Sequence, residues 1–402
     1  MANNNENKVL NVPHLRFQEF TGEWEMERLD EIATLSKGIG ISKEQLSNDG
    51  EPCILYGELY TKYKSEIIKQ IDSKTNIDNS KLKRSKANDV IIPCSGETAV
   101  DIATARCVPF DNILLGGDLN VISLHQYDGA FMSYQLNGKR KYDIAKVAQG
   151  VSVVHLYGEH LKAITTCNPC LQEQQKIAKL LSLLDDRIAT QNKIIEDLKK
   201  LKSAIIEEHY KQAKKQSIRV ADLGKPFTVG SLSKEDLSET GKPCVIYGEL
   251  FTTYGATINQ VESHTNKFDG MTLSKKGDLL FPSSTTVDAV SLIAPSAINV
   301  DNVILGGDMF GIHIDSNFDA QYLSYYFNHI AKKQFAKYAK GSTIIHLHYK
   351  DIEKAQLLLP CLEEQNKIAV CLVSLDERIA VENKFLKSLA CQKSYLIEHM
   401  FI

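Results

Sequence analysis

Two long stretches of the chain carry apolar residues three and four positions apart, one in the middle and one at the end. Pro169 and Pro360 precede them, and the second stretch repeats the first 191 residues later. A mean apolar period of 3.5 residues is typical of helices that wind round one another. It predicts two long helices that share one seam. The seam positions are Ile177, Leu181, Leu184, Ile188, Ile195, Leu198, Ile368, Leu372, Leu375, Ile379, Leu386 and Leu389.

Polar residues interrupt both seams at matching places. Gln191 corresponds to Glu382, and Lys202 corresponds to Lys393. Polar layers of this kind can fix the register and the partner of a coiled-coil helix. Two amphipathic helices packed on separate cores are the alternative, but their equal phase favours packing on each other. A helix from about 171 to 214 would span roughly 60 Å.

The segments that precede the two helices also repeat each other. Pro52–Tyr60, Asp89–Pro93, Asn112–Asp118 and Val121–Leu124 are short apolar runs between turn residues and are predicted to be strands. Asp128 is then expected to cap one helix over about 130–148, and Gly150 to end it before an extended segment. The second segment repeats this order at offsets of 189 to 191 residues, with equivalent apolar positions and different polar ones. One duplicated scaffold therefore carries two different surfaces.

The fold class expected is α+β, with two similar domains of strands and short helices joined by two long helices as an antiparallel coiled coil. The predicted divisions are a disordered tail at 1–14, a first domain at 15–168, a helical spacer at 169–215, a second domain at 216–359 and a helical spacer at 360–402.

Composition indicates a globular protein of a reducing compartment. The chain has 402 residues, of which 43% are hydrophobic and 24% are charged, and its nine cysteines are scattered. Cys167 and Cys170 form a C-x-x-C, but no second pair accompanies them, so we interpret them as structural. The sequence shows no targeting segment and no run of membrane-spanning length, so a cytoplasmic location and no membrane partner are expected.

Positive charge is clustered although the formal net charge is −3. Basic runs lie at 62–86, at 137–142 and at 332–340, and the last two occupy matching places in the repeat. A basic run is usually a solvated face, but its recurrence in the duplication favours a surface for a phosphate backbone.

Several catalytic motifs are absent from the sequence. There is no phosphate-binding P-loop and no dinucleotide-binding glycine pattern. Asn168-Pro-Cys170 is not the Asn/Asp-Pro-Pro-aromatic tetrapeptide of amino-methylating enzymes. His155 and His346 repeat but have no matching nucleophile. The sequence therefore predicts a recognition protein without a reaction centre of its own, and no catalytic residue and no metal site are assigned.

The ordered motifs resemble one family across nearly the whole chain. They are Pro13-x-Leu-Arg-Phe17 with Trp24, and the twice-used Pro…Glu-Gln-x-Lys-Ile-Ala…Leu-Asp…Ile pattern that begins at Pro169 and at Pro360. The chain resembles the specificity subunit of type I restriction–modification systems.

The resemblance implies two target recognition domains, related by a pseudo-twofold, that each read one half of a bipartite double-stranded DNA target. The helices would set the gap between the half-sites. It further implies two methyltransferase (modification) subunits that bind the helices, and two restriction/translocase subunits. S-adenosylmethionine, ATP and Mg²⁺ would be used by those partners, and this chain would hold no cofactor.

Base reading requires polar side chains on loops that can enter a groove, while Lys and Arg bind phosphates. We expect such contacts at the segments that close the basic helices, then at two polar turns, and then at tyrosines. The candidates are Lys146, Gln149, Ser152, His155, Lys337, Lys340, Ser342, Thr343, His346, Ser95, Glu97, Thr98, Ser283, Ser284, Thr285, Tyr60 and Tyr254. Two alternatives remain open. One is a coiled-coil scaffold with two protein-binding domains, and the other is the reader of a related methylase-only defence system.

Overall fold

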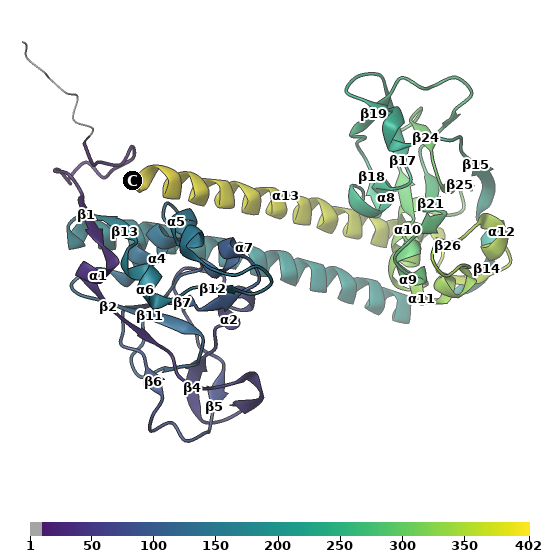
Figure 1. Ribbon diagram of the computed structural model, residues 1–402. Coiled ribbons are helices and arrows are strands. Elements are labelled where there is room, and N and C mark those ends of the chain that lie inside the picture. Colours follow the sequence, from purple (N-terminus) through teal and green to yellow (C-terminus); the bar gives the residue numbers. More distant parts are fainter. Residues whose placement is uncertain (1–9) are drawn as a thin grey trace, which may run out of the picture. The chain divides into compact units, whose positions relative to one another are not determined.

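The computed structural model describes residues 10–402. These residues form two compact units. Unit 1 holds the chain up to Asn192 together with Lys384–Ile402, and unit 2 holds Lys193–Asn383. Each unit combines one globular domain with part of each of two long helices, α7 (Leu171–Gln212) and α13 (Leu362–Met400) (Figure 1). The two long helices expected from the apolar period are therefore confirmed.

The domain of unit 1 is built around a four-stranded and a five-stranded sheet. One has the order β2-β11-β7-β9 and is antiparallel throughout; the other has the order β3-β5-β4-β10-β6, in which β4 and β10 are parallel. The strands are β2 (Ala33–Lys37), β3 (Leu46–Ser47), β4 (Glu51–Ile54), β5 (Lys74–Thr75), β6 (Lys83–Arg84), β7 (Asp89–Pro93), β9 (Arg106–Val108), β10 (Leu114–Leu115) and β11 (Leu119–Leu124).

The burial of strand β7 on both of its faces explains why its sequence is an unbroken apolar run. Val90 and Ile92 belong to one buried cluster, whereas Ile91 belongs to another on the opposite face. Because successive side chains of a strand point to opposite faces, a strand covered on both sides must be apolar at every position. The domain's remaining helices are short: α1 (Leu29–Ile32), η1 (Lys43–Gln45), α2 (Glu58–Thr61), α3 (Ala99–Ile102), α4 (Gly129–Asn137), α5 (Lys141–Val147) and α6 (Gly158–Lys162).

The domain of unit 2 repeats this construction. Its sheets have the orders β15-β25-β21-β23-β18 and β16-β19-β17-β24-β20. The strands are β15 (Gly224–Thr228), β16 (Leu237–Ser238), β17 (Lys242–Ile246), β18 (Thr257–Ile258), β19 (Ser263–Thr265), β20 (Thr272–Leu273), β21 (Asp278–Pro282), β23 (Ser296–Ile298), β24 (Ile304–Gly306) and β25 (Met309–Ile314). The helices are η2 (Val220–Asp222), η3 (Lys234–Asp236), α8 (Glu249–Thr252), α9 (Ala289–Leu292), α10 (Ala320–His329), α11 (Lys332–Phe335), η4 (Ala336–Tyr338) and α12 (Tyr349–Ile352). The duplication read from the sequence is thus a duplication of the fold.

The single helix expected over 130–148 is wrong in its extent. Asp128 does cap it, since its Oδ1 accepts a hydrogen bond from Phe131 N at 2.8 Å, but the helix ends at Asn137. Gly138 follows with backbone angles outside the helical region, and α5 begins three residues later. In unit 2, Asp319 caps α10 in the same way, and a second break follows His329.

A two-stranded ladder links each domain to its long helix. In unit 1, β1 (Glu25–Arg28) pairs with β13 (Thr165–Asn168), which leads into α7. In unit 2, β14 (Gln216–Arg219) pairs with β27 (Gln356–Leu359), which leads into α13. Two buried glutamines reinforce this link. Gln174 accepts from Asp128 N at 2.9 Å and donates to Pro169 O at 2.7 Å, while Gln365 accepts from Asp319 N and donates to Pro360 O.

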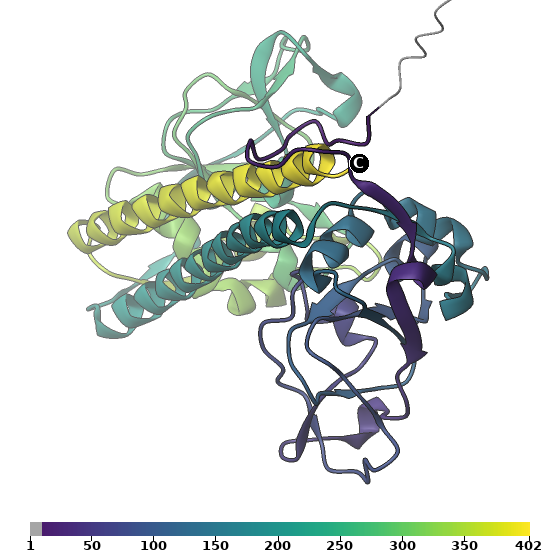
Figure 2. The same cartoon turned by 90° about the vertical axis from the view of Figure 1, so that its left-hand side faces the viewer.

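The first described residues pack along unit 1. Pro13 is buried, Leu15 N donates to His399 O at 2.8 Å, and Arg16 forms an ion pair with Glu173 at 2.7 Å. Of the tail expected at 1–14, residues 1–9 lie outside the described part of the chain. In both views the last turns of α13 lie alongside the first turns of α7 in this unit (Figure 2).

Candidate nucleic-acid interface

Each domain carries a tight hairpin where the sequence led us to expect DNA contacts. In unit 1, Gln149 and His155 exchange backbone hydrogen bonds of 2.9 and 2.7 Å. In unit 2, Lys340 and His346 do the same at 2.9 and 2.7 Å. The same local geometry is therefore built twice.

A glycine begins each hairpin loop because the backbone leaves no room for a side chain. Gly150 has a φ of +122°, and a Cβ there would lie 2.1 Å from Val153 O. Gly341 has a φ of +118°, and its Cβ would lie 2.0 Å from Ile344 O. Such left-handed backbone angles are accessible to glycine and strained for other residues.

The returning strand of each hairpin pairs with one of the polar turns. In unit 1, β12 (Val154–His155) is antiparallel to β8 (Ser95–Gly96), with His155 opposite Ser95. In unit 2, β26 (Ile345–His346) is antiparallel to β22 (Ser284–Thr285), with His346 opposite Ser284. The structure therefore brings together, within each domain, the two groups of candidates that the sequence had placed far apart along the chain.

Exposure separates the candidates that can reach a partner from those that cannot. The hairpin residues Gln149, Ser152, His155, Ser342 and Thr343 are exposed, as are Glu97 and Thr98 in the turn of unit 1. His346 and Thr285 are half-buried. Val151, at the tip of the hairpin in unit 1, is 97% exposed. An apolar side chain held in solvent in this way is available for contact with another molecule.

Three serine candidates instead lie inside the domains. Ser95, Ser283 and Ser284 are buried. Ser95 Oγ donates to Asp118 Oδ2 at 3.1 Å, and Ser284 Oγ donates to Asp308 Oδ2 at 2.5 Å. The hydroxyls of Ser95 and Ser284 hold the turns in place, so a direct base contact by these two serines lacks structural support.

Sequence reasoning missed the two aspartates that hold the turns. Asp118 has a φ of +56°, and its carboxylate anchors Ser95 from the position just before β11. Asp308 does the same for Ser284 in unit 2. The signal was present in the repeated Leu-Gly-Gly-Asp at 115–118 and 305–308, where two glycines precede the same acid.

The three candidate lysines differ in whether a nearby carboxylate already offsets their positive charge. Lys146 is exposed and lies 3.5 Å from Asp143. Lys340 forms an ion pair with Asp351 at 2.5 Å, and this hydrogen bond lowers the pKa of the Asp351 carboxyl. Lys337 is exposed and forms no ion pair with any described residue. Lys337 is therefore the strongest phosphate-binding candidate of the three.

Acids partly neutralise the basic run at 62–86. Lys62 pairs with Glu58, Lys69 pairs with Asp186 of α7, and Arg84 pairs with Glu51. The charge count of this run therefore overstates the positive potential that it offers to a partner.

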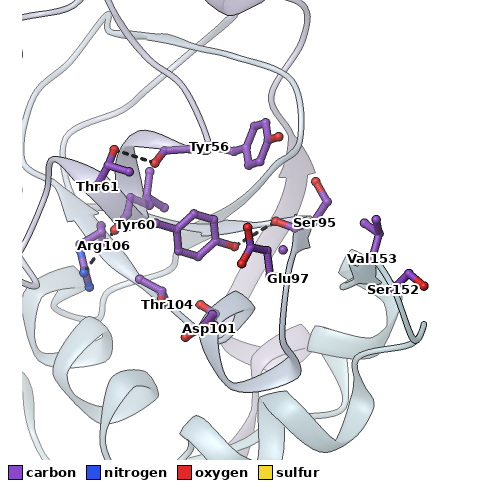
Figure 3. A pocket seen from close by; sticks show the side chains of 13 residues that line it. Tyr56, Tyr60, Thr61, Ser95, Glu97, Asp101, Thr104, Arg106, Ser152 and Val153 are labelled. Carbon is purple, nitrogen blue, oxygen red and sulfur yellow. Dashed lines mark hydrogen bonds between the residues drawn. The ribbon is translucent and has the colours of Figure 1, made fainter. Parts of the chain in front are cut away.

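A pocket of about 670 Å³ lies beside the hairpin of unit 1 (Figure 3). Tyr60 stands in it, and its hydroxyl donates to Ser95 O at 2.9 Å. Burial raises the pKa of Tyr60, so this hydroxyl stays protonated and acts as a donor. Arg106 also lines the pocket, and its guanidinium donates to the carbonyls of Tyr63 and Ala105 at 3.0 and 2.9 Å. Burial lowers the pKa of this guanidinium.

In unit 2, a second pocket of about 520 Å³ lies at the corresponding hairpin. Its lining includes Asp308, Lys340, His346 and His348, and the two imidazole rings stack with centroids 6.1 Å apart. Tyr254 is not part of it. Its hydroxyl accepts a hydrogen bond from Glu262 N at 3.1 Å, and its ring packs against a buried apolar cluster.

The seam of the long helices is buried as expected. None of its twelve apolar positions is exposed; Ile177, Leu181, Ile195, Leu372 and Leu389 are buried, and the others are half-buried. Within unit 1, Ile177 and Leu181 of α7 share a buried cluster with Leu396 and Ile397 of α13. Within unit 2, Ile206 packs with Leu372 and Ile368. In each unit, lower-numbered residues of one helix meet higher-numbered residues of the other, so the segments are antiparallel.

The lysines of the seam have specific partners. In unit 1, Lys393 contacts Asp185 and Glu66, both at 2.6 Å, and Tyr134 donates to Asp185 at 2.6 Å. Burial acts to lower the pKa of Lys393, but the carboxylates of Glu66 and Asp185 outweigh it and the pKa is raised. In unit 2, Lys202 contacts Asp376 at 2.5 Å, and Tyr325 donates to Asp376 at 2.6 Å.

Two further observations concern alternative chemistry. Among residues 10–402, no group of three or more His, Cys, Asp or Glu side chains is placed to hold a metal ion. Within the same range, no helix is long and apolar enough to cross a membrane.

The sequence matches the family described as "Type I restriction modification DNA specificity domain" twice, over residues 21–200 and 213–390. The chain belongs to this family: it is a specificity subunit of a type I restriction–modification system, with two recognition domains.

Two relatives agree with this assignment, and two solved structures share the fold. The chain is 24% identical to the type I restriction enzyme MjaVIII specificity subunit of Methanocaldococcus jannaschii, over 90% of this chain and 88% of that protein. It is 28% identical to the putative MjaX specificity subunit of the same organism, over 61% of this chain and 59% of that protein. The crystal structure of the type I system S subunit from M. genitalium matches with a TM-score of 0.67 and 16% identity, over 97% of this chain and 99% of that chain. A chain from a structure of a type I R-M system matches with a TM-score of 0.52 and 15% identity, over 94% and 97%. Both structural likenesses concern the fold alone.

Proposed function

We propose that this chain reads a bipartite DNA target, with one half-site bound by each recognition domain and the gap set by α7 and α13. The chain itself carries out no reaction. It directs an adenine methyltransferase and a restriction subunit to the sequence that it binds. In this proposal the partners use S-adenosylmethionine, ATP and Mg²⁺, and the complex works in the cytoplasm.

The duplicated hairpin and turn are the observation that carries this proposal. Both domains hold the same backbone geometry through Gly150 and Gly341, yet the side chains on it differ. Gln149 corresponds to Lys340, and Val151 corresponds to Ser342. Sequence is read by side chains that touch base edges, while a common backbone fixes the approach to the duplex. Two domains that share the hairpin backbone but carry different side chains on it are suited to two different half-sites.

The long helices support the assembly with partner subunits. Apolar side chains that the seam does not cover remain exposed on them, including Leu183 at 55%, Val370 at 67% and Val381 at 61%. Exposed apolar surface on a helix is a common feature of protein interfaces. We propose two methyltransferase subunits on these helices and two restriction subunits in the complete complex.

Methylation-sensitive sequencing of the host genome, with the gene intact and deleted, tests the proposal. We expect one bipartite N6-methyladenine motif to disappear on deletion. If the methylome is unchanged, a binding experiment distinguishes a silent system from a scaffold protein. It measures whether this chain, assembled with its methyltransferase subunits, binds labelled genomic DNA fragments with sequence preference. A complex without sequence-specific binding would contradict the proposal and favour a protein-binding scaffold.

A further inference from the structure

The pocket beside the hairpin of unit 1 differs in chemistry from the equivalent positions of unit 2. Tyr60, Asp101 and Arg106 line it, whereas the repeat places Phe251, Ser291 and Ser296 at those positions. The domain scaffold is the same, so these polar groups are not required by the fold. These three side chains are among the differences between the surfaces of the first and the second domain.

Glu97 provides the free hydrogen-bond acceptor at the mouth of this pocket. It follows β8 directly, is exposed, and makes no hydrogen bond or ion pair within the described part of the chain. The other carboxylate of the pocket is occupied, because Asp101 accepts from Thr98 Oγ1 at 2.6 Å. Glu97 lines the same pocket as Tyr60, and the close-up shows both side chains (Figure 3).

A free carboxylate is an unusual group to find on a surface that faces DNA. It repels phosphates. The guanidinium of Arg106 does not neutralise it, because that group donates to the backbone carbonyls of Tyr63 and Ala105. Such a group favours binding only if the DNA presents a hydrogen-bond donor to it. In the major groove, the N4 amino group of cytosine is a donor that Glu and Asp accept from.

We propose that Glu97 reads a cytosine in the half-site bound by the first domain, by accepting a hydrogen bond from its N4 amino group. Tyr60 positions the turn that carries Glu97 through its bond to Ser95 O. Thr286 follows β22 in the second domain as Glu97 follows β8, so this cytosine reading is confined to one half-site. The inference rests on the proposed function and names one base that the first domain selects.

The test compares wild type and Glu97→Gln in the full chain assembled with its methyltransferase subunits. Binding is measured to duplexes in which each base pair of the motif is replaced in turn. Wild type is expected to lose about 5- to 150-fold in affinity when one C·G pair of the first half-site is replaced. Glu97→Gln should lose this discrimination and shift toward adenine at the same position, since Gln pairs with adenine N6 and N7. All other positions should keep their preferences.

Two further variants complete the experiment. Glu159→Gln removes the same charge from an exposed site outside the pocket, where Glu159 pairs with Lys162, and should leave the motif unchanged. Tyr60→Phe introduces the side chain found in the second domain and should weaken the preference at the same base pair by a smaller factor. Unfolding midpoints of the variants confirm that each is folded.

The results that overturn the inference differ from those that overturn the proposed function. If wild type binds a bipartite motif whose first half-site lacks a C·G pair, or if Glu97→Gln keeps the full cytosine preference, Glu97 is not the reader. If wild-type complex binds no DNA sequence preferentially, the proposed function itself fails.

Discussion

Lys393 of α13 and Asp185 of α7 form an ion pair at 2.6 Å inside unit 1, and the repeat reproduces this pair in unit 2 as Lys202 and Asp376. In each pair the lysine comes from one long helix and the aspartate from the other. Each unit therefore contains the same kind of contact between two antiparallel helix segments. The lysine positions of the polar layers seen in the sequence, Lys202 and Lys393, therefore form matched ion pairs, which disfavour a shift of one helix segment along the other.

Replacing Lys393 is expected to destabilise the protein strongly. The side chains of Lys393, Asp185 and Glu66 are only 18%, 6% and 11% exposed, so Lys393→Met leaves two buried carboxylates without a cation. Breaking a buried pair in this way costs about 3–5 kcal/mol. Urea unfolding followed by circular dichroism measures the loss.

Two other lysines provide matched controls for that experiment. Lys202→Met should cost less, because Asp376 is 31% exposed and Ala256 replaces Glu66 in unit 2. Lys200→Met should cost below about 0.5 kcal/mol, since Lys200 and Glu196 are 69% and 64% exposed. Equal losses for all three variants would show that the buried network contributes nothing specific.

The hairpin glycines are expected to control one half-site each. Gly150→Ala forces a methyl group against Val153 O and should cost about 1–3 kcal/mol of local strain. The hairpin of the first domain would distort, so discrimination at the first half-site should fall while the second stays intact. Gly341→Ala should give the reciprocal result. Gly255→Ala is the control, because a Cβ there meets nothing within 4 Å. Loss of both half-sites in one variant would contradict this assignment.

Lys337 and Lys340 are expected to differ as phosphate contacts. Lys337→Gln should weaken binding to all sequences and lower the slope of log affinity against log salt by about one. Lys340→Gln should change that slope less, because Asp351 already offsets its charge. Fluorescence anisotropy at several salt concentrations measures both. A larger effect at Lys340 would mean that its pair with Asp351 opens when DNA binds.

Much of the architecture could be predicted from the sequence because it depends on patterns. The seam from Ile177 to Leu389 follows from apolar period, and the repeat follows from matching positions 191 residues apart. The break at Gly138 was missed because residues 130–148 keep enough helix-forming side chains to suggest continuity. The burial of Ser95 and Ser284 was also missed. Their turns are polar in sequence, and only the folded chain places Asp118 and Asp308 against them.

The spacing role of the helices predicts the effect of lengthening both of them. One heptad inserted after Gln191 and one after Glu382 adds about 10 Å of helix to each while keeping both Lys–Asp pairs in register. At 3.4 Å per base pair, the gap of the methylated motif should grow by about three base pairs. Both half-sites should remain as they are. A motif with altered half-sites and an unaltered gap would refute the spacer role.

Exchange of single domains tests the central claim most directly. Residues 15–165, or residues 218–355, are replaced by the equivalent segment of another specificity subunit, and the methylome of the host is sequenced. If each domain reads one half-site, each exchange changes one half of the bipartite motif and leaves the other half unchanged. If either exchange changes both halves, or neither, the two domains do not read separate half-sites and the account is wrong.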